Sequence, residues 1–578
     1  MTSDFTSLVH MLRHRAAVDS DRTAFIFLTG DDLQEACLTY AQLDQEARSI
    51  AVALAKRNVL GQPVLLLEPP GLRFMAALFG CLYAGAIVVP SYPPGPREGS
   101  KSASRFLRVV RDARPVVVIG SGKSLETARG MVAAELPCID LDSQTGQAED
   151  DWAEPKLSQS DVALVQYTSG STSTPKGVTL THGNFLSNLQ AIAIATGVSA
   201  SSVGVNWLPP YHDMGLTASI LLPVYVGFMA AHMSPNQFLF RPQCWLEAIT
   251  HYRGTICVAP NFAYDLCVRR VSEEERTQLD LSNWNAASNG AEPIRYETLS
   301  RFSKSFAGCG FKIASFLPCY GLAEATVWVS GKPVQTEPLV GRFSKTDLER
   351  GLVVPLGQVD TNVLQENLPE RRLVSNGRVA GCFDLKIVNP RTGSDSPANE
   401  VGEILIAGPS VSPGYWKNEE ATREAFADEP EDMVAKRFLK TGDLGFVHGG
   451  ELYITGRLKD LIIVRGLNYY PQDIELASET AHPAVMPNGA CAFAVEGDDG
   501  EKVVVACEIA RTQARKADLN EVMNLIRAAV GDELELQVSS VVLLKQGALP
   551  RTTSGKLRHS ACAQAYLDRI LNPLAQKE

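Results

Sequence analysis

Hydrophobic positions in the first part of the chain alternate between helical spacing and short runs rich in β-branched residues. Phe185, Leu186, Leu189 and Ile192 have the spacing of one helix face. Strand-like runs lie at Val116–Ile119, Thr255–Val258 and Lys312–Phe316. Alternation of this kind is typical of a parallel or mixed sheet covered by helices, so we predict a large α/β domain.

The pattern changes after Cys382, where short strands are separated by Gly, Pro and Asn turns. These strands are Asp384–Val388, Gly402–Ile406 and Glu451–Ile454. They predict a small β subdomain at about residues 380–457, which ends an N-terminal domain of residues 1–458. Residues 459–578 contain the runs Val503–Cys507 and Val541–Leu544, which predict a separate C-terminal domain.

Composition narrows the class of protein. The 578 residues, 45% of them apolar, can bury several cores, and a net charge of −11 argues against nucleic acid as the main ligand. The twelve cysteines include no Cys-x-x-Cys pair, so we expect them to be reduced and mostly buried.

The N-terminus lacks the features of a secretory signal, which favours a cytoplasmic protein. The longest apolar stretch, Phe74 to Val89, is shorter than the roughly 18 to 20 residues of a membrane span and is expected to be a buried helix running into a strand. A monomer is the default expectation.

The segment Tyr167–Gly177 concentrates hydroxyls, glycines and one lysine directly after the apolar run Asp161–Gln166. Small residues let a backbone approach an anion, and hydroxyls and a lysine can bind phosphate oxygens. We expect the loop to join a buried strand to the helix that contains Phe185. The candidate phosphate-binding residues are Thr168, Ser169, Gly170, Ser171, Thr172 and Lys176. The loop lacks the Walker A spacing, because Lys176 precedes the second glycine. A flexible Ser/Thr linker is the alternative interpretation.

A second glycine-containing segment, Val116–Ser124, also follows a strand-like run. It fails the Walker A pattern at Val117 and the dinucleotide pattern at Leu125. We therefore expect no nucleotide site there.

The Thr168–Lys176 loop resembles that of adenylate-forming enzymes, and further segments match this family in the same order along nearly the whole chain. Ser288–Pro293 resembles the adenine-pocket segment, and Tyr320–Thr326 resembles the segment that stacks the base and holds magnesium. The resemblance implies a nucleotide-binding role for Asn289, Gly290, Ala291, Glu292, Tyr320, Gly321, Leu322 and Ala323. It also implies that Glu324 and Thr168 hold Mg²⁺, which prefers hard oxygen ligands. Taken alone, each segment could be a structural turn.

Three positions near the domain boundary and the C-terminus complete this resemblance. Asp443 and Arg457 resemble the ribose-binding pair, and Lys459 matches the hinge at which the domains rotate. Lys556, in Pro550–Arg558, resembles the catalytic lysine, whose ammonium would offset the repulsion between carboxylate and phosphate. Without the family match, Asp443 would be read as a turn residue and Lys556 as a surface lysine.

Two segments, Trp207–Gly215 and Ala259–Tyr264, look most like fatty acyl-AMP ligases. This branch builds its acyl tunnel around the counterparts of His212 and Met214, and we include His212 among the catalytic residues. The run Ile220–Tyr225 could line the tunnel or be core, and core is the better expectation for most of it. Residues from about 345 to 376 resemble the insertion that distinguishes acyl-AMP ligases from acyl-CoA synthetases, although a surface loop of no catalytic importance is the alternative.

The resemblance implies a large N-terminal domain of two α/β subdomains plus a small β-barrel-like subdomain, and a small mobile α+β C-terminal domain. The implied reaction uses ATP and Mg²⁺ to convert a medium- or long-chain fatty acid into an acyl-adenylate, releasing pyrophosphate. The acyl group then passes to the phosphopantetheine thiol of an acyl carrier protein, which we expect to bind in trans. Lys545, Arg551 and Arg558 are candidates for a basic patch that receives an acidic carrier. An acyl-CoA synthetase and a non-catalytic adenylate-binding regulator are the alternative functions.

Overall fold

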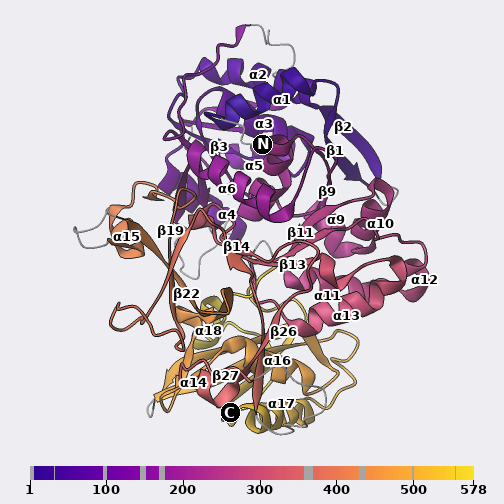
Figure 1. The fold of residues 1–578 in the computed structure, drawn as a ribbon, viewed down its shortest axis with the longest axis vertical. Coiled ribbons are helices and arrows are strands. Elements are labelled where there is room, and N and C mark those ends of the chain that lie inside the picture. Colours follow the sequence, from indigo (N-terminus) through magenta and orange to yellow (C-terminus); the bar gives the residue numbers. More distant parts are fainter. Residues whose placement is uncertain are drawn as a thin grey trace.

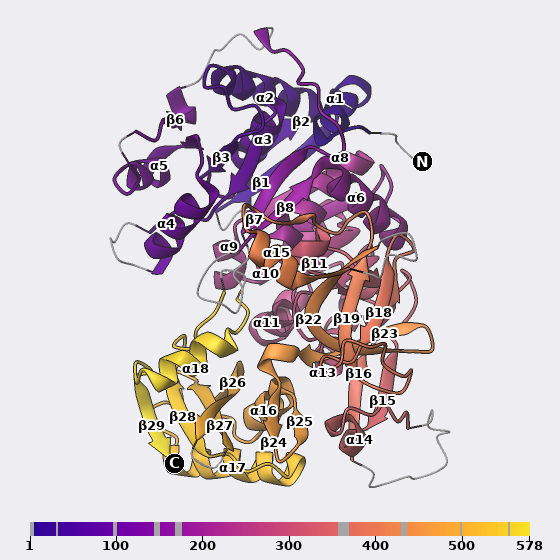
Figure 2. The same cartoon turned by 90° about the vertical axis from the view of Figure 1, so that its left-hand side faces the viewer.

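The chain folds into a large N-terminal part and a smaller C-terminal lobe, which is yellow in Figures 1 and 2. The computed structural model describes residues 5–30, 33–95, 101–133, 135–143, 151–167, 176–356, 369–428, 436–497, 500–552 and 555–577. The N-terminal part is built on two large sheets with helices packed against them, so the predicted α/β class is confirmed.

The first large sheet has a parallel centre and antiparallel edges. In spatial order its described strands are β17 (Arg378–Val379), β14 (Ser330–Gly331), β13 (Phe316–Tyr320), β12 (Ala286–Asn289), β11 (Ile256–Ala259), β9 (Val203–Asn206), β10 (Met229–Met233), β1 (Thr23–Thr29) and β2 (Gln34–Thr39). Strands β11, β12 and β13 are buried along their whole length, as expected for a parallel sheet covered on both faces.

The second large sheet contains the strand that leads into the predicted phosphate loop. Its described strands, in spatial order, are β20 (Gly414–Tyr415), β8 (Gly177–Thr181), β7 (Val162–Tyr167), β4 (Ile87–Pro90), β3 (Pro63–Leu66), β5 (Val117–Gly120) and β6 (Cys138–Asp140). The apolar stretch Phe74–Val89 is a buried helix followed by β4, as predicted.

Helices surround both sheets. They are α1 (Leu8–Val18), α2 (Tyr40–Ala55), α3 (Leu72–Tyr83), α4 (Lys101–Ala113), α5 (Gly122–Arg129), α6 (His182–Thr196), α7 (Asp213–Leu216), α8 (Leu222–Val226), α9 (Pro235–Phe240), α10 (Gln243–Tyr252), α11 (Asn261–Arg270), α12 (Glu273–Arg276) and α13 (Tyr296–Phe306). Short 3₁₀ turns lie at η1 (Leu141–Ser143), η4 (Ala307–Cys309), η5 (Ile313–Ser315) and η6 (Ala323–Ala325), and η3 (Thr217–Leu221) is a π-helix. Thr181 caps the N-terminus of α6 and forms a capping box with Asn184.

A β subdomain follows, with α15 (Glu419–Ala425) beside it. Its described strands are β18 (Asp384–Val388), β19 (Gly402–Ala407), β21 (Phe426–Asp428), β22 (Arg437–His448) and β23 (Glu451–Arg457). Within the predicted insertion, the described residues form α14 (Lys345–Glu349) and β16 (Glu370–Val374), and β16 pairs antiparallel with β15 (Val340–Ser344), which precedes the insertion. Residues 357–368 of that insertion lie outside the described residues.

The C-terminal lobe starts at η7 (Leu458–Asp460), which contains the predicted hinge residue Lys459. Its further elements are β24 (Ile462–Val464), β25 (Leu467–Tyr469), α16 (Pro471–Thr480), β26 (Val485–Gly497), β27 (Gly500–Ile509), α17 (Leu519–Leu534), β28 (Ser540–Lys545), α18 (His559–Leu567) and β29 (Pro573–Lys577). The sheet β26–β27–β28–β29 has an apolar core on each face, one with α16 and α17 and the other with α18. The lobe therefore has its own cores.

Two local predictions were wrong. Lys312–Phe316 is not a strand, because residues 313–315 form a 3₁₀ turn and the strand starts at Phe316. The segment after Tyr167 does not lead directly into a helix either. Strand β8 comes first and pairs antiparallel with β7, and α6 follows it.

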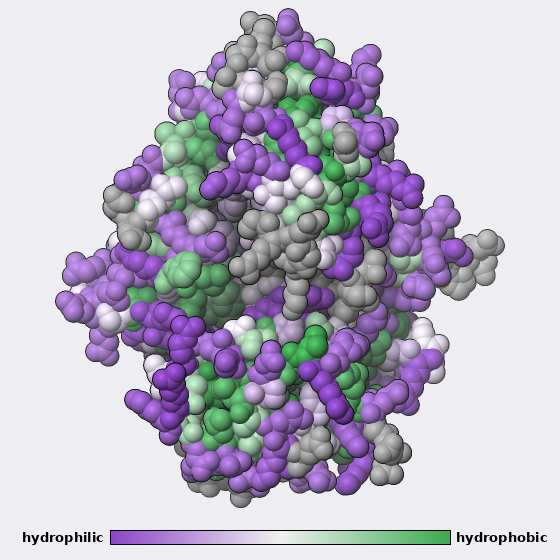
Figure 3. Space-filling model, turned by 180° about the vertical axis from the view of Figure 1, so that it is seen from behind, coloured by the Kyte–Doolittle hydropathy of each residue, from purple (hydrophilic) through white to green (hydrophobic). Residues whose placement is uncertain are grey.

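The surface is polar with scattered apolar residues. Seen from behind, hydrophilic side chains cover most of the face and hydrophobic ones lie between them (Figure 3). All twelve cysteines are free, and nine are buried. Among the described residues, no helix combines the length and the apolar character that crossing a bilayer requires.

Candidate active site

A cavity of about 1010 Å³ lies where the N-terminal part meets the C-terminal lobe. Most of the predicted site residues line it although they come from distant parts of the sequence. They are Lys176, His212, Ala291, Glu292, Tyr320, Gly321, Leu322, Ala323, Glu324, Asp443, Arg457, Lys459 and Lys556. The fold thus brings one chemically coherent set of side chains together.

Asp443 anchors one end of this cavity. Its carboxylate accepts a hydrogen bond from the Tyr320 hydroxyl at 2.8 Å and one from Arg457 Nε at 3.1 Å. Asp443 and Arg457 are cross-strand partners on β22 and β23, so the antiparallel register sets their distance. Burial, together with the Asp443 charge, raises the pKa of Tyr320, which therefore stays a donor. A carboxylate held in this way can accept hydrogen bonds from a sugar diol.

Glu324 lies in the 3₁₀ turn η6 after β13. Its Oε1 accepts a hydrogen bond from the Tyr415 hydroxyl at 2.9 Å, and burial raises the pKa of Glu324. The Lys176 ammonium lies 5.0 Å from the centre of the Tyr415 ring. The turn depends on Gly321, because a Cβ at this position would stand 1.6 Å from the carbonyl oxygen of Val327.

The predicted phosphate loop is described only at its ends, Tyr167 and Lys176. Thr168, Ser169, Gly170, Ser171 and Thr172 lie outside the described residues. The other glycine-containing segment, Val116–Ser124, forms β5 and the start of α5, and the cavity lining among the described residues does not include it.

The segment after β12 forms a wall of the cavity. The Glu292 carboxylate accepts a hydrogen bond from the Phe262 amide at 2.6 Å, and Ala291 has a left-handed backbone with φ +70°. Asn289 and Gly290 do not line the cavity. Asn289 is fully buried and donates to Asn261, so the segment lines the cavity through Ser288, Ala291, Glu292 and Pro293.

His212 is the N-cap of the short helix α7, and its Nδ1 lies 2.6 Å from Asp213 Oδ1. Burial acts to raise the pKa of Asp213, but His212 and Lys556 outweigh it and lower that pKa to about 2. Asp213, which lines the cavity, is therefore negatively charged near neutral pH.

Lys556 reaches this centre from the C-terminal lobe. Its loop is held by hydrogen bonds between Lys556 and Thr552 in both directions, at 2.8 and 3.0 Å. A Cβ at Gly555 would stand 3.2 Å from the Phe262 ring, so the loop packs against the N-terminal part. Burial lowers the pKa of Lys556, while the charge of Asp213 opposes this effect. Arg457 lowers this pKa as well, whereas the charges of Glu292 and Asp443 raise it, and all three side chains line the same cavity as Lys556.

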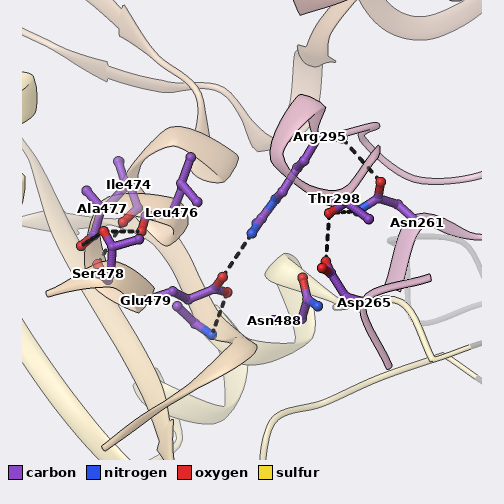
Figure 4. A network of polar contacts seen from close by, with 12 residues as sticks. Asn261, Asp265, Arg295, Thr298, Ile474, Leu476, Ala477, Ser478, Glu479 and Asn488 are labelled. Atoms are coloured by element: carbon purple, nitrogen blue, oxygen red, sulfur yellow. Dashed lines mark hydrogen bonds and ion pairs between the residues drawn. The ribbon is translucent and has the colours of Figure 1, made fainter. Parts of the chain in front are cut away.

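Among the residues that the structure describes, two ion pairs join the C-terminal lobe to the N-terminal part. Arg295 Nη1 lies 2.8 Å from Glu479 Oε2 on α16, with both side chains largely buried (Figure 4). The Arg295 amide in turn donates to Asn261, whose side chain donates to Thr298. These contacts hold α16, and with it the Lys556 lobe, in the closed position.

The second ion pair comes from the predicted insertion. Arg371 on β16 lies 3.0 Å from Asp473 on α16 and stacks on the Tyr470 ring at 4.1 Å. Lys345 on α14 donates to the Glu533 carbonyl of α17. Figure 2 shows α14 beside the C-terminal lobe. The insertion therefore contacts this lobe as well as the β subdomain, against which Phe343 and Leu348 pack.

One arm of the cavity is apolar. Side chains from α6, η3, α8 and β11 line it, among them Ile192, Ala218, Leu222 and Val258. Within the run Ile220–Tyr225, Leu222 alone lines the cavity, and Ile220, Leu221, Val224 and Tyr225 belong to the core. The expectation that most of this run is core is confirmed.

Sequence reasoning missed the partners that hold the site. Tyr415, Arg295 and Glu479 have no local signal, because each meets its partner across 91 to 184 residues of sequence. A tertiary contact of this kind cannot be inferred from spacing along one chain.

Comparisons with known proteins agree with this geometry. Residues 12–416 match the AMP-binding enzyme family, and residues 459–576 match the Disco-interacting protein 2-like, AMP domain family. The medium-chain-fatty-acid–[acyl-carrier-protein] ligase JamA of Moorena producens (strain JHB) is 40% identical over 98% of this chain and 96% of its own length. The long-chain-fatty-acid–AMP ligase FadD32 of Mycolicibacterium smegmatis (strain ATCC 700084 / mc(2)155) is 33% identical over 98% of this chain and 95% of its own length.

Solved structures give the same result. The fatty acyl-adenylate ligase from L. pneumophila in complex with acyl adenylate and pyrophosphate is 38% identical, with a TM-score of 0.76 over 100% of this chain and 98% of that one. A structure from a study of fatty acyl-adenylate ligases from E. coli and L. pneumophila is 31% identical, with a TM-score of 0.87 over 98% of both chains. This chain belongs to the AMP-binding enzyme family, and within it to the fatty acyl-AMP ligases.

Proposed function

We propose that this protein activates a medium- or long-chain fatty acid with ATP to the acyl-adenylate, releases pyrophosphate, and transfers the acyl group to the phosphopantetheine thiol of an acyl carrier protein. The observation that carries the proposal is that Lys556 of the C-terminal lobe lines one cavity together with Asp213, Glu292 and Asp443 and with apolar side chains such as Ile192, Leu222 and Val258. Such a cavity offers polar groups to a nucleotide and apolar surface to a fatty acid.

The residues divide the first half-reaction between them. The Asp443 carboxylate accepts hydrogen bonds from the ribose hydroxyls, and its own position is fixed by hydrogen bonds from Tyr320 and Arg457. The apolar arm takes the acyl chain, so that its carboxylate faces the α-phosphate. One carboxylate oxygen attacks the α-phosphorus, and the bond from phosphorus to the bridging oxygen breaks. The Lys556 ammonium lowers the repulsion between these anions as they approach.

Glu324 is the residue that fits a magnesium ion. Its buried carboxylate faces the cavity with one oxygen bonded to Tyr415, and Mg²⁺ prefers hard oxygen ligands. The bound ion would offset negative charge on the phosphates. The second proposed ligand, Thr168, lies outside the described residues.

The acceptor of the acyl group is proposed from two features. The relatives JamA and FadD32 are named as a carrier-protein ligase and an AMP ligase. The insertion contacts the C-terminal lobe through Arg371 and Lys345, which ties down the lobe that has to rotate for any thiol to enter. We further propose that the protein acts as a cytoplasmic monomer and meets its carrier in trans.

The test supplies ATP, Mg²⁺ and fatty acids of several chain lengths, and then either coenzyme A or a phosphopantetheinylated carrier. Acyl-AMP should form with the acid alone, and acyl-carrier should form on addition of the carrier. Acyl-CoA produced as fast as acyl-carrier would show an acyl-CoA synthetase instead. Binding of ATP without acyl-AMP, for every acid tested, would show a non-catalytic regulator.

A further inference from the structure

A chain of buried hydrogen bonds leads from the interior of the N-terminal part to the Arg295–Glu479 ion pair (Figure 4). It begins at Asp265 on α11, whose Oδ2 accepts a hydrogen bond from the Thr298 hydroxyl at 2.7 Å. Thr298 Oγ1 accepts from Asn261 Nδ2 at 3.1 Å, and Asn261 Oδ1 accepts from the backbone N–H of Arg295 at 3.3 Å. Asp265, Thr298 and Asn261 are at most 5% exposed, so solvent does not compete for these bonds.

The chemistry of the donors fixes the direction of each bond. Arg301 Nη2 lies 2.8 Å from Asp265 Oδ1, which favours an ionised carboxylate that can only accept. The Thr298 proton therefore points to Asp265, and the Thr298 oxygen is left to accept from the amide nitrogen of Asn261. The carbonyl oxygen of Asn261 must then face the Arg295 N–H. The acceptor atom of Asn261, and not its donor, thus holds Arg295.

Asn261 joins three elements through this one side chain. It is the first residue of α11, and its Oδ1 also accepts at 3.3 Å from Asn289 at the end of β12. Arg295 is the N-cap of α13. The Asn261 amide therefore ties the start of α13 to β12 and α11, and from this point the Arg295 side chain reaches Glu479 at 2.8 Å. Asn261 belongs to the segment Ala259–Tyr264, to which the proposed half-reaction assigns no role.

We propose that Asn261 is a positioning residue for lobe closure, whose amide holds the backbone of Arg295 so that the guanidinium meets Glu479 of α16. The inference rests on the proposed function, because the closed lobe is the one that brings Lys556 into the cavity. Without the amide, the Arg295 N–H and the Asn289 side chain lose an acceptor in a buried network, and the start of α13 shifts to satisfy them. The guanidinium then meets Glu479 less often, and adenylate formation slows while the ribose end stays intact.

The test removes the polar atoms of Asn261 and keeps the shape of the side chain. For Asn261→Leu we expect single-turnover formation of acyl-AMP, at saturating ATP and acid, to slow about ten-fold. The Kd for ATP should stay within about two-fold of wild type, because the residues at the ribose end are unchanged. Asn285→Leu makes the same change at an exposed asparagine of the N-terminal part and should match wild type.

A double-mutant cycle separates positioning from general damage. In a background of Arg295→Met with Glu479→Gln, which removes both charges of the ion pair, Asn261→Leu should slow the reaction by no more than about two-fold. Small-angle X-ray scattering of the full chain follows the share of closed lobes without turnover, and Asn261→Leu should lower this share only where the ion pair is intact. Thr298→Val, which removes the hydroxyl that orients the amide, should give the same pattern, and Thr298→Ser should behave as wild type. These variants carry the test if Asn261→Leu does not fold by circular dichroism.

An equal slowing in both backgrounds would show that Asn261 only supports the fold, and the proposal would be wrong. A raised KM for ATP or for the acid, with an unchanged rate at saturation, would also overturn it, because Asn261 would then bind a substrate directly. If the wild type made no acyl-AMP from any acid, the proposed function would fail. A scattering change confined to the background with the ion pair would even then support positioning by Asn261, and the absence of any change would refute it.

Discussion

The two ends of the cavity are built in different ways. At the ribose end, Asp443 pairs with Arg457 on the adjacent strand and accepts a hydrogen bond from Tyr320 of β13, all within the N-terminal part. At the centre, Lys556 arrives from a separate lobe, which is held by the pairs Arg295–Glu479 and Arg371–Asp473. The first set of contacts persists in any lobe position, whereas the second is lost when the lobe moves. Nucleotide binding and catalysis should therefore be separable by substitution.

The largest effect is expected for Lys556→Ala. Loss of the ammonium removes transition-state stabilisation, so single-turnover formation of acyl-AMP should slow by about 10²- to 10³-fold. The Kd for ATP should change little, because the ribose end remains intact. Lys545→Ala, an exposed lysine of the same lobe, is the matched control. An equal loss of ATP affinity and of rate would contradict the separation of the two ends.

Reversing the charge of Arg295, and so breaking the Arg295–Glu479 ion pair, should have the next largest effect. Arg295→Glu leaves two buried carboxylates facing each other, which favours the open lobe and should slow acyl-AMP formation roughly 10- to 100-fold. The double variant Arg295→Glu with Glu479→Arg restores opposite charges and should recover much of the rate. If the effects of the two single variants simply added in the double variant, with no recovery of rate, the pair would not position the lobe.

At the ribose end, Asp443→Asn should do the reverse of Lys556→Ala: it should weaken ATP binding and leave the rate of acyl-AMP formation nearly unchanged. The amide keeps the shape of the side chain but loses the charge that Tyr320 and Arg457 meet, so the Kd for ATP should rise about ten-fold. The single-turnover rate at saturating ATP should stay within a few-fold of wild type. A large loss of that rate at saturation would show that Asp443 acts on the chemical step.

The smallest effect is expected for the pH dependence of the stability of the C-terminal lobe. Burial acts to lower the pKa of His559, but Glu475 at 2.6 Å and Asp460 outweigh it and raise that pKa to about 9. A raised pKa stabilises the fold below the unfolded value of about 6.5, and this contribution is lost as pH rises through 9. The free energy of unfolding should fall by about 1–3 kcal/mol between pH 6.5 and 9.5, and His559→Gln should flatten that fall. Identical curves for both proteins would show that the ion pair adds nothing.

Much of the site could be predicted from sequence because its motifs are local. Asp443 with Arg457, Glu324 and Lys556 each lie in a short segment whose residues resemble one family, and the fold brings them to one cavity. Asn289 and Gly290 belong to such a segment but do not line the cavity, because the Asn289 side chain is buried and donates to Asn261 and Gly290 packs against Cys319.

The remaining features depend on tertiary structure. The Arg295–Glu479 contact joins residues 184 apart in the sequence, so it depends on how the two parts of the chain pack. Strand β8 was missed although Val178, Thr179 and Thr181 are β-branched, because a five-residue strand between a loop and a helix gives a weak periodic signal. The shift of β13 to Phe316 has the same cause, since a short apolar run fits a turn or a strand.

The central claim is that the lobe position seen here, with Lys556 in the cavity, is the one that forms the adenylate. The most direct test links the C-terminal lobe to the N-terminal part in that position. Arg295→Cys with Glu479→Cys, in a Cys37→Ser background because Cys37 is exposed, is joined by a bis-maleimide linker. The linked protein should form acyl-AMP in a single turnover at close to the wild-type rate, and should fail to acylate the carrier. A linked protein that makes no acyl-AMP, while the unlinked variant does, would show that the closed lobe with Lys556 in the cavity is not the state that forms the adenylate.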